Sequence, residues 1–118
     1  MKKLVMIAAL VIAGSAQAQD APAGDVRNGA AHFVSDGCWQ CHNYGGIGAA
    51  LTGPRLARTA LPFEAFLHQL RQPASEMAPY EAAVLSDQTA ADIYAWLKSQ
   101  PEPPKLENLP LLQTMGVK

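Results

Sequence analysis

Apolar and polar positions along this chain follow the period of α-helices in three segments. Residues 25–36, 62–72 and 86–99 carry apolar side chains three or four positions apart, which places them on one face of a helix. Pro62 suits the first turn of the second segment, and Ser86 suits the N-cap of the third. No segment shows the two-residue period of a strand. The pattern therefore predicts an all-α domain.

The segments between these helices are irregular. Residues 43–61 are rich in glycine and have no sustained period, and residues 74–85 are also irregular. No strand precedes the glycines and no Lys-Ser/Thr pair follows them, so a loop folded tightly against a flat cofactor is favoured over a phosphate-binding loop. The prolines at positions 101, 103 and 104 prevent the last helix from continuing. Residues 101–118 are thus expected to form a proline-rich C-terminal tail, extended over the domain surface or ordered against another protein.

The first 18 residues have the pattern of a secretory signal peptide. A basic start precedes an apolar run at residues 4–13, and small residues stand at positions 16 and 18. The apolar run is about half of the roughly 20 residues needed to span a bilayer, which disfavours a retained anchor. No later segment is long and apolar enough to span. We therefore expect cleavage after Ala18, export to the periplasm, and no membrane span afterwards.

Length and charge narrow the class of protein. The chain has 118 residues and a formal net charge of −1, and it becomes more acidic when Lys2 and Lys3 leave with the signal peptide. The absence of a basic stripe argues against nucleic acid as a partner. A domain of this size buries little core of its own. A covalently held cofactor would complete the core, and the chain should fold poorly before it is attached.

The candidate chemistry lies in the segment Cys38-Trp39-Gln40-Cys41-His42, which holds both cysteines of the chain. Two thiols one helical turn apart, followed by a histidine, are typical of covalent haem c attachment, with His42 as an axial ligand of the iron. A thioredoxin-like pair requires a preceding strand, a zinc site requires a second ligand pair, and a disulfide is open to an exported protein. The adjacent histidine and the preceding helix favour haem over these alternatives.

Four residues are candidates for the sixth iron ligand. His32 has no evident route to the far face of a haem, His68 lies off the apolar stripe of its helix, and Met115 is close to the C-terminus. Met77 lies in an irregular loop beside Pro79 and is favoured. Ligation by His42 and a methionine leaves no open position on the iron and raises the reduction potential, which suits transfer of single electrons.

From about residue 25 to residue 99 the chain resembles class I c-type cytochromes. The family's landmarks occur in order, namely Gly29 and Phe33, the attachment motif, Thr52-Gly53-Pro54-Arg55-Leu56, Met77, and Ile93-Tyr94-Ala95-Trp96-Leu97. One detail departs from the family, because Ala78 separates Met77 from Pro79 and many members have these two residues adjacent.

The resemblance implies a fold and a set of contacts. Residues 19–100 would form a cytochrome c domain, in which three main helices and their loops wrap one covalent haem c and the first and third helices cross. The Pro54 carbonyl would accept a hydrogen bond from the second ring nitrogen of His42. Residues implied to pack on or around the haem are Leu56, Phe66, Leu67 and Trp96. Arg55 is a candidate partner for a haem propionate, with a solvated arginine as the alternative.

These features predict an electron carrier rather than an enzyme. Its donor would be a periplasmic dehydrogenase, with flavoproteins among the candidates, and its acceptor a cytochrome, a copper protein or an oxidase. Electrons are expected to pass at the haem edge near Cys38 and Cys41. Arg71-Gln72-Pro73, followed by Met77 and Tyr80, also resembles small cytochromes that serve such dehydrogenases. An obligate subunit of a flavocytochrome dehydrogenase is therefore the alternative. A second alternative is a haem-based sensor or small-ligand binder. It requires that the bond between Met77 and the iron be weak or absent.

Overall fold

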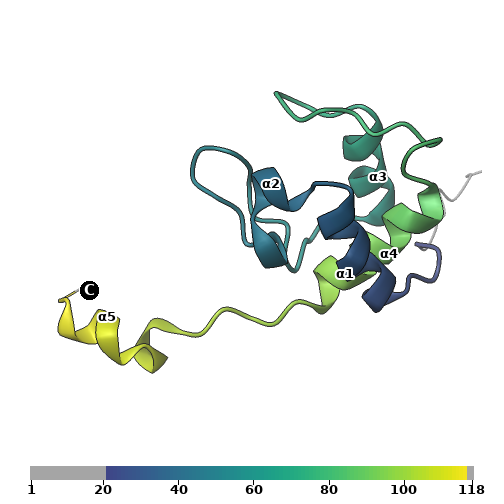
Figure 1. Ribbon diagram of the computed structural model, residues 1–118. Helices are drawn as coiled ribbons and strands as arrows, with labels where there is room; N and C mark the ends of the chain where they lie inside the picture. Colours follow the sequence, from purple (N-terminus) through teal and green to yellow (C-terminus); the bar gives the residue numbers. More distant parts are fainter. Residues whose placement is uncertain (1–20, 117–118) are drawn as a thin grey trace, which may run out of the picture.

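The computed structural model describes residues 21–116, and this part of the chain is all-α (Figure 1). The domain contains α1 (Val26–Ser35), α2 (Trp39–His42), the 3-10 turn η1 (Tyr44–Gly46), α3 (Phe63–Arg71) and α4 (Asp87–Ser99), and the tail contains η2 (Leu106–Asn108) and α5 (Pro110–Thr114). The predicted signal peptide lies outside the described residues. No helix within residues 21–116 has both the length and the apolar character needed to cross a membrane.

The ends of α1 follow from its cap residues. The Asp25 carboxylate accepts hydrogen bonds from the backbone amides of Arg27 at 2.8 Å and Asn28 at 3.0 Å. These bonds, that from Asn28 foremost, lower the pKa of Asp25. Gly37 has a φ of +82°, the left-handed conformation that ends a helix, and so turns the chain directly into Cys38. The segment predicted as helical thus contains α1 together with a cap residue at each end.

The crossing of α1 and α4 organises the domain, as predicted (Figure 1). A Cβ atom on Gly29 would lie 2.0 Å from the backbone oxygen of Asp92, so only glycine allows the two backbones to approach this closely. The buried Asp92 carboxylate accepts hydrogen bonds from the Asp25 amide at 2.8 Å and the Gln88 side chain at 2.9 Å. This carboxylate therefore joins the start of α1 to the middle of α4.

The hydrophobic core lies between α1, α3 and α4. α3 contributes the predicted stripe, although Pro62 occupies its N-cap and not its first turn. On α4, Ser86 caps the helix by accepting a hydrogen bond from the Thr89 amide at 3.0 Å. The ring of Phe33 packs against Trp96 with centroids 4.7 Å apart. The buried residues of this core cluster are Phe33, Phe63, Phe66, Leu70, Leu85, Ala90, Ala91, Ile93 and Leu97.

The glycine-rich loop at residues 43–61 is irregular but fixed by backbone hydrogen bonds. The Gly46 carbonyl accepts hydrogen bonds from the amides of Leu56 and Ala57, both at 2.8 Å. The Arg58 amide donates to the carbonyl of Leu97 on α4 at 2.7 Å. The loop is thereby folded back onto the domain, beside the C-terminal part of α4.

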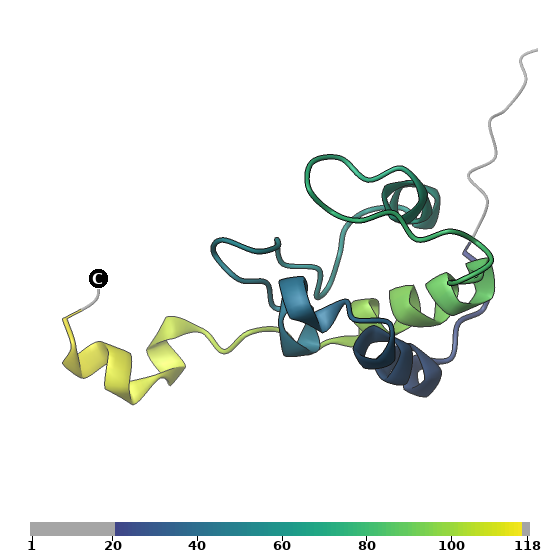
Figure 2. The same cartoon turned by 45° about the horizontal axis from the view of Figure 1, so that its top comes forward.

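The tail does not extend over the domain surface, which was one of the two expectations. It leaves the end of α4 and runs away from the domain in both ribbon views (Figures 1 and 2). The prolines at 101, 103 and 104 fix an extended backbone that carries the following residues outwards. The helical turns η2 and α5 then pack on each other, a feature that the sequence pattern did not predict.

Candidate haem site

The attachment motif forms the short helix α2. The His42 amide donates to the Cys38 carbonyl at 3.0 Å, which closes the turn between them. Both cysteines are free thiols, with Cys38 half-buried and Cys41 exposed. The disulfide considered as an alternative does not join them.

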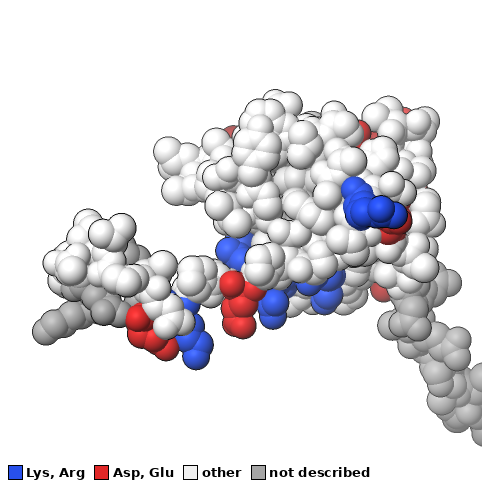
Figure 3. Space-filling view, turned by 60° about the horizontal axis from the view of Figure 1, so that its bottom comes forward, with Lys and Arg blue, Asp and Glu red and all other residues white. Residues whose placement is uncertain are grey.

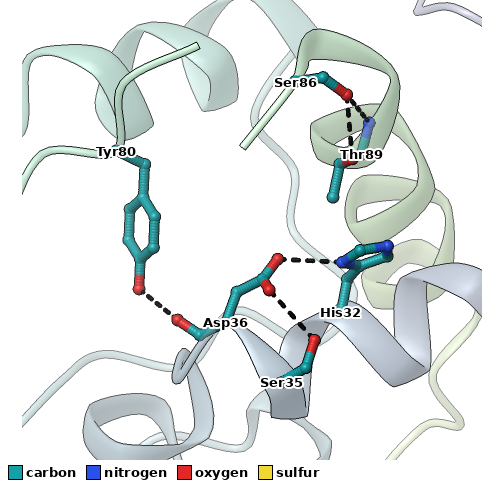
Figure 4. Close-up of polar contacts among 6 residues, drawn as sticks. All are labelled: His32, Ser35, Asp36, Tyr80, Ser86 and Thr89. Atoms are coloured by element: carbon teal, nitrogen blue, oxygen red, sulfur yellow. Dashed lines mark hydrogen bonds and ion pairs between the residues drawn. The ribbon is translucent and has the colours of Figure 1, made fainter. Parts of the chain in front are cut away.

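The Cys38 thiol lies beside Tyr80. Burial raises the pKa of the Cys38 thiol, so this group stays protonated at neutral pH. The Tyr80 hydroxyl lies next to this thiol and donates a hydrogen bond to the backbone oxygen of Asp36 at 2.9 Å (Figure 4). Burial, with a contribution from the neighbouring Cys38, raises the pKa of Tyr80 to about 12. Tyr80 thus connects the segment after Met77 to the start of the attachment motif.

His42 is buried and oriented by Pro54. Its Nδ1 lies 2.9 Å from the Pro54 carbonyl oxygen, which is the contact that the family resemblance implies. Because a carbonyl only accepts, Nδ1 carries the proton and Nε2 carries the lone pair. Nε2 makes no hydrogen bond within residues 21–116. The ring is therefore held in the tautomer that binds a metal through Nε2.

The segment Thr52-Gly53-Pro54 fits closely around the end of α2. The Thr52 hydroxyl donates to the Cys41 carbonyl at 2.8 Å. A Cβ atom on Gly53 would lie 2.8 Å from that carbonyl oxygen and 2.9 Å from His42 Nδ1, so a larger residue would press on the imidazole. The family resemblance implied the contact of Pro54 with His42, whereas it marked Thr52 and Gly53 only as landmarks, and their close fit around the end of α2 comes from the structure.

Met77 lies half-buried in the loop between α3 and α4, and this loop lies above α2 in both ribbon views (Figures 1 and 2). Its sulfur is 3.9 Å from Gln69 Nε2, which donates a weak hydrogen bond to it. The side-chain oxygen Oε1 of Gln69 accepts a hydrogen bond from the Ala74 amide at 3.3 Å, which fixes the orientation of the side-chain amide. Sequence reasoning missed Gln69, because its position on the helix gives no sign of a partner in the following loop.

The residues present fit a haem group. Cys38, Leu56, Leu67, Met77 and Trp96 are half-buried and pack against the edge of the core. Their exposed portions are mainly apolar, which is the surface that a large, flat, apolar group can cover. Together with the two thiols and the free Nε2 of His42, they supply the donors and the apolar contacts that a haem requires.

The other candidate ligands lie elsewhere. His32 Nδ1 is 3.1 Å from the Asp36 carboxylate on its own helix (Figure 4), and His68 is exposed on α3. Met115 follows α5 at the far end of the tail, away from α2 (Figures 1 and 2). No cluster of three or more His, Cys, Asp or Glu side chains within the described residues could hold a metal ion. Met77 is thus the candidate that packs half-buried against the core, in the loop whose Tyr80 lies next to Cys38.

Comparison with known proteins adds one finding. The sequence model of the family described as "Cytochrome C oxidase, cbb3-type, subunit III" matches residues 24–97. This range begins at the residue before the α1 cap and ends within the last turn of α4, so it covers the whole site. Neither the curated proteins nor the solved structures contain a match to the chain.

Proposed function

Since the chain belongs to this family of c-type cytochrome domains, which bind haem c and transfer electrons, we propose that it is a periplasmic carrier of single electrons. Cys38 and Cys41 would hold one haem covalently, and His42 and Met77 would bind its iron. The observation that carries this proposal is the hydrogen bond from His42 Nδ1 to the Pro54 carbonyl, directly after two free thiols on one helical turn. This arrangement prepares a histidine to bind iron beside an attachment site.

The chain's own residues orient the group and exclude other ligands. When bound, the haem supplies a one-electron couple between ferric and ferrous iron. Pro54 keeps the proton on Nδ1 of His42, which leaves Nε2 as the donor in both oxidation states. Met77 would supply the second donor to the iron and would so keep oxygen and substrates from binding there. Covalent attachment would need no co-reactant, because the sulfur and the hydrogen of each thiol would both add across one vinyl double bond.

The surface around the attachment site suits brief docking of redox partners. Residues 37–54 contain no Lys, Arg, Asp or Glu. Within this stretch Cys41 is exposed, and so are Tyr44, Ile47 and Leu51, the last of which is 98% exposed. A small, largely apolar contact of this kind is typical of transient electron-transfer complexes. The donor is a periplasmic dehydrogenase, and the acceptor is a cytochrome, a copper protein or an oxidase.

The exported protein itself tests this proposal. Its mass should equal that of the chain from Gln19 onwards plus one haem, and the bond should survive acid extraction of free haem. Met77→Ala should lower the reduction potential and allow carbon monoxide to bind the ferrous iron. Met115→Ala is the matched control, and it should change neither property. An unchanged spectrum and potential in Met77→Ala would refute the ligand assignment, and a mass without haem would refute attachment.

The tail favours a second candidate, an obligate subunit of a dehydrogenase complex. Leu111 is 79% exposed and Met115 is 71% exposed, and residues 108–116 contain no charged side chain. Figure 3 shows this end of the tail projecting from the domain as an uncharged surface. A folded apolar segment that the domain leaves uncovered is a common means of anchoring to a larger protein.

Native purification separates the two candidates. A subunit should elute at the mass of a complex with a fixed ratio of haem to the dehydrogenase cofactor, and truncation after Gln100 should release the haem domain. A free carrier should elute as the isolated chain with or without the tail. Protease treatment of the native preparation gives an independent check, because a tail that is cleaved in every preparation contradicts the subunit assignment.

A further inference from the structure

The loop that carries Met77 is closed at its base by two neighbouring residues of α3. The Tyr80 amide donates to the Leu70 carbonyl at 2.8 Å, and the Tyr80 carbonyl accepts from Arg71 Nη1 at 2.8 Å. Both backbone groups of Tyr80 are therefore held at the C-terminal end of α3. The side chain of Tyr80 is held as well, by its hydrogen bond to Asp36 at the end of α1 (Figure 4).

Besides its bond to Tyr80, the Arg71 side chain contacts two residues at the start of α4. Its Nη2 also donates to the Leu85 carbonyl at 2.8 Å and to the Asp87 carboxylate at 2.6 Å. The Arg71 side chain is 20% exposed, whereas that of Asp87 is 62% exposed. The ion pair is thus largely solvated and contributes little. The hydrogen bonds to the Tyr80 and Leu85 carbonyls are better shielded from water than the ion pair. Removing the Arg71 guanidinium would leave these two part-buried carbonyls without a donor.

The position of these bonds makes them relevant to the iron. Met77 lies three residues before Tyr80, and Pro79 between them restricts the backbone. Displacement of the Tyr80 backbone is therefore passed on to Met77. We propose that Arg71 is a positioning residue for the axial thioether, holding the Met77 loop closed so that the sulfur seldom leaves the iron. This proposal rests on the assignment of Met77 as a ligand, and it adds a residue that touches neither the haem nor the iron.

Binding of imidazole to the ferric protein tests the proposal. Imidazole replaces a thioether that has dissociated, so at saturating imidazole the observed rate equals the dissociation rate of Met77 and no longer depends on imidazole concentration. Arg71→Leu, which has no donor, should raise this limiting rate at least tenfold and raise the imidazole affinity in parallel. Should that variant not yield a haem protein, Arg71→Lys is measured. It keeps one cation but cannot reach both carbonyls, and it should raise the limiting rate at least threefold.

Two matched controls separate positioning of the ligand from general loss of stability. Asp87→Asn removes only the solvated ion pair, and Ser86→Ala removes the α4 cap without touching the loop closure. Both should keep the limiting rate within twofold of the unmodified protein. The proposal is overturned if the Arg71 variants leave the rate unchanged, or if Ser86→Ala raises it as much. Failure of the ligand assignment looks different, because then Met77→Ala and the unmodified protein bind imidazole alike.

Discussion

The close crossing of α1 and α4 makes a specific prediction for Gly29→Ala. Within a helix, alanine is favoured over glycine by about 1 kcal/mol, so helix propensity alone predicts a more stable protein. The structure predicts the opposite. The new methyl group would lie 2.0 Å from the Asp92 oxygen and 2.5 Å from its carbonyl carbon, both of which are backbone atoms that cannot turn away.

The helices would have to separate by at least ~1 Å to restore an ordinary contact, and overpacking of this kind costs about 1–3 kcal/mol. Separation also stretches the 2.8 Å hydrogen bond from the Asp25 amide to Asp92. We therefore expect Gly29→Ala to lower the free energy of unfolding by about 1 kcal/mol, because the gain in helix propensity offsets part of the overpacking cost. Urea unfolding of the haem-loaded protein, followed by far-ultraviolet circular dichroism, measures this value.

The exposed neighbour Asn28 supplies the control for this experiment. Asn28→Ala changes a side chain on the outer face of α1 and should stay within about 0.5 kcal/mol of the unmodified protein. If Gly29→Ala instead stabilises the protein by about 1 kcal/mol, the two backbones do not meet at this residue and the reasoning fails.

Three further substitutions test the supports of the site. Gly53→Ala should press on His42 and shift the reduction potential and the haem absorption, whereas a spectrum identical to the original would contradict the close fit. Ser86→Ala should cost about 1 kcal/mol of stability in urea unfolding, through loss of the bond to the Thr89 amide. Because folding raises the pKa of Tyr80 to about 12, the folded state keeps a proton that the unfolded state loses near pH 10. Stability should therefore fall between pH 10 and 12, and Tyr80→Phe should reduce that fall.

The sequence predicted the three main helices and the attachment residues because both signals are local. Apolar spacing places Phe63, Phe66 and Leu70 on one face without knowledge of what they contact, and the cysteine spacing needs only one helical turn. The same spacing places Gly29 and Trp96 on the apolar faces of the first and third helices, and the family resemblance assigns them to the crossing. The crossing that the resemblance implied is the one observed.

The supports of Met77 could not be predicted in this way. Gln69 bonds to a loop residue eight positions on, and Arg71 bonds to carbonyls nine and fourteen positions on. These partners depend on the path of an irregular loop. Every residue has a backbone carbonyl, so the sequence does not show which one accepts a hydrogen bond. The direction of the tail could not be predicted from the sequence either, because prolines show where a helix ends but not where the following chain runs.

The crossing of α1 and α4 also decides the order in which the domain assembles. The hydrogen bond from Asp25 to Asp92 joins residues 67 positions apart, and closing a loop of that length costs about 4 kcal/mol of chain entropy. The buried face of Phe33 has its partners on α4, so α1 gains no stable packing until the last helix is available. The domain therefore folds as one unit after its C-terminal helix has appeared. If the proposed attachment is right, Cys38 and Cys41, which lie far upstream of that helix, are open to the cofactor while the chain is still unfolded.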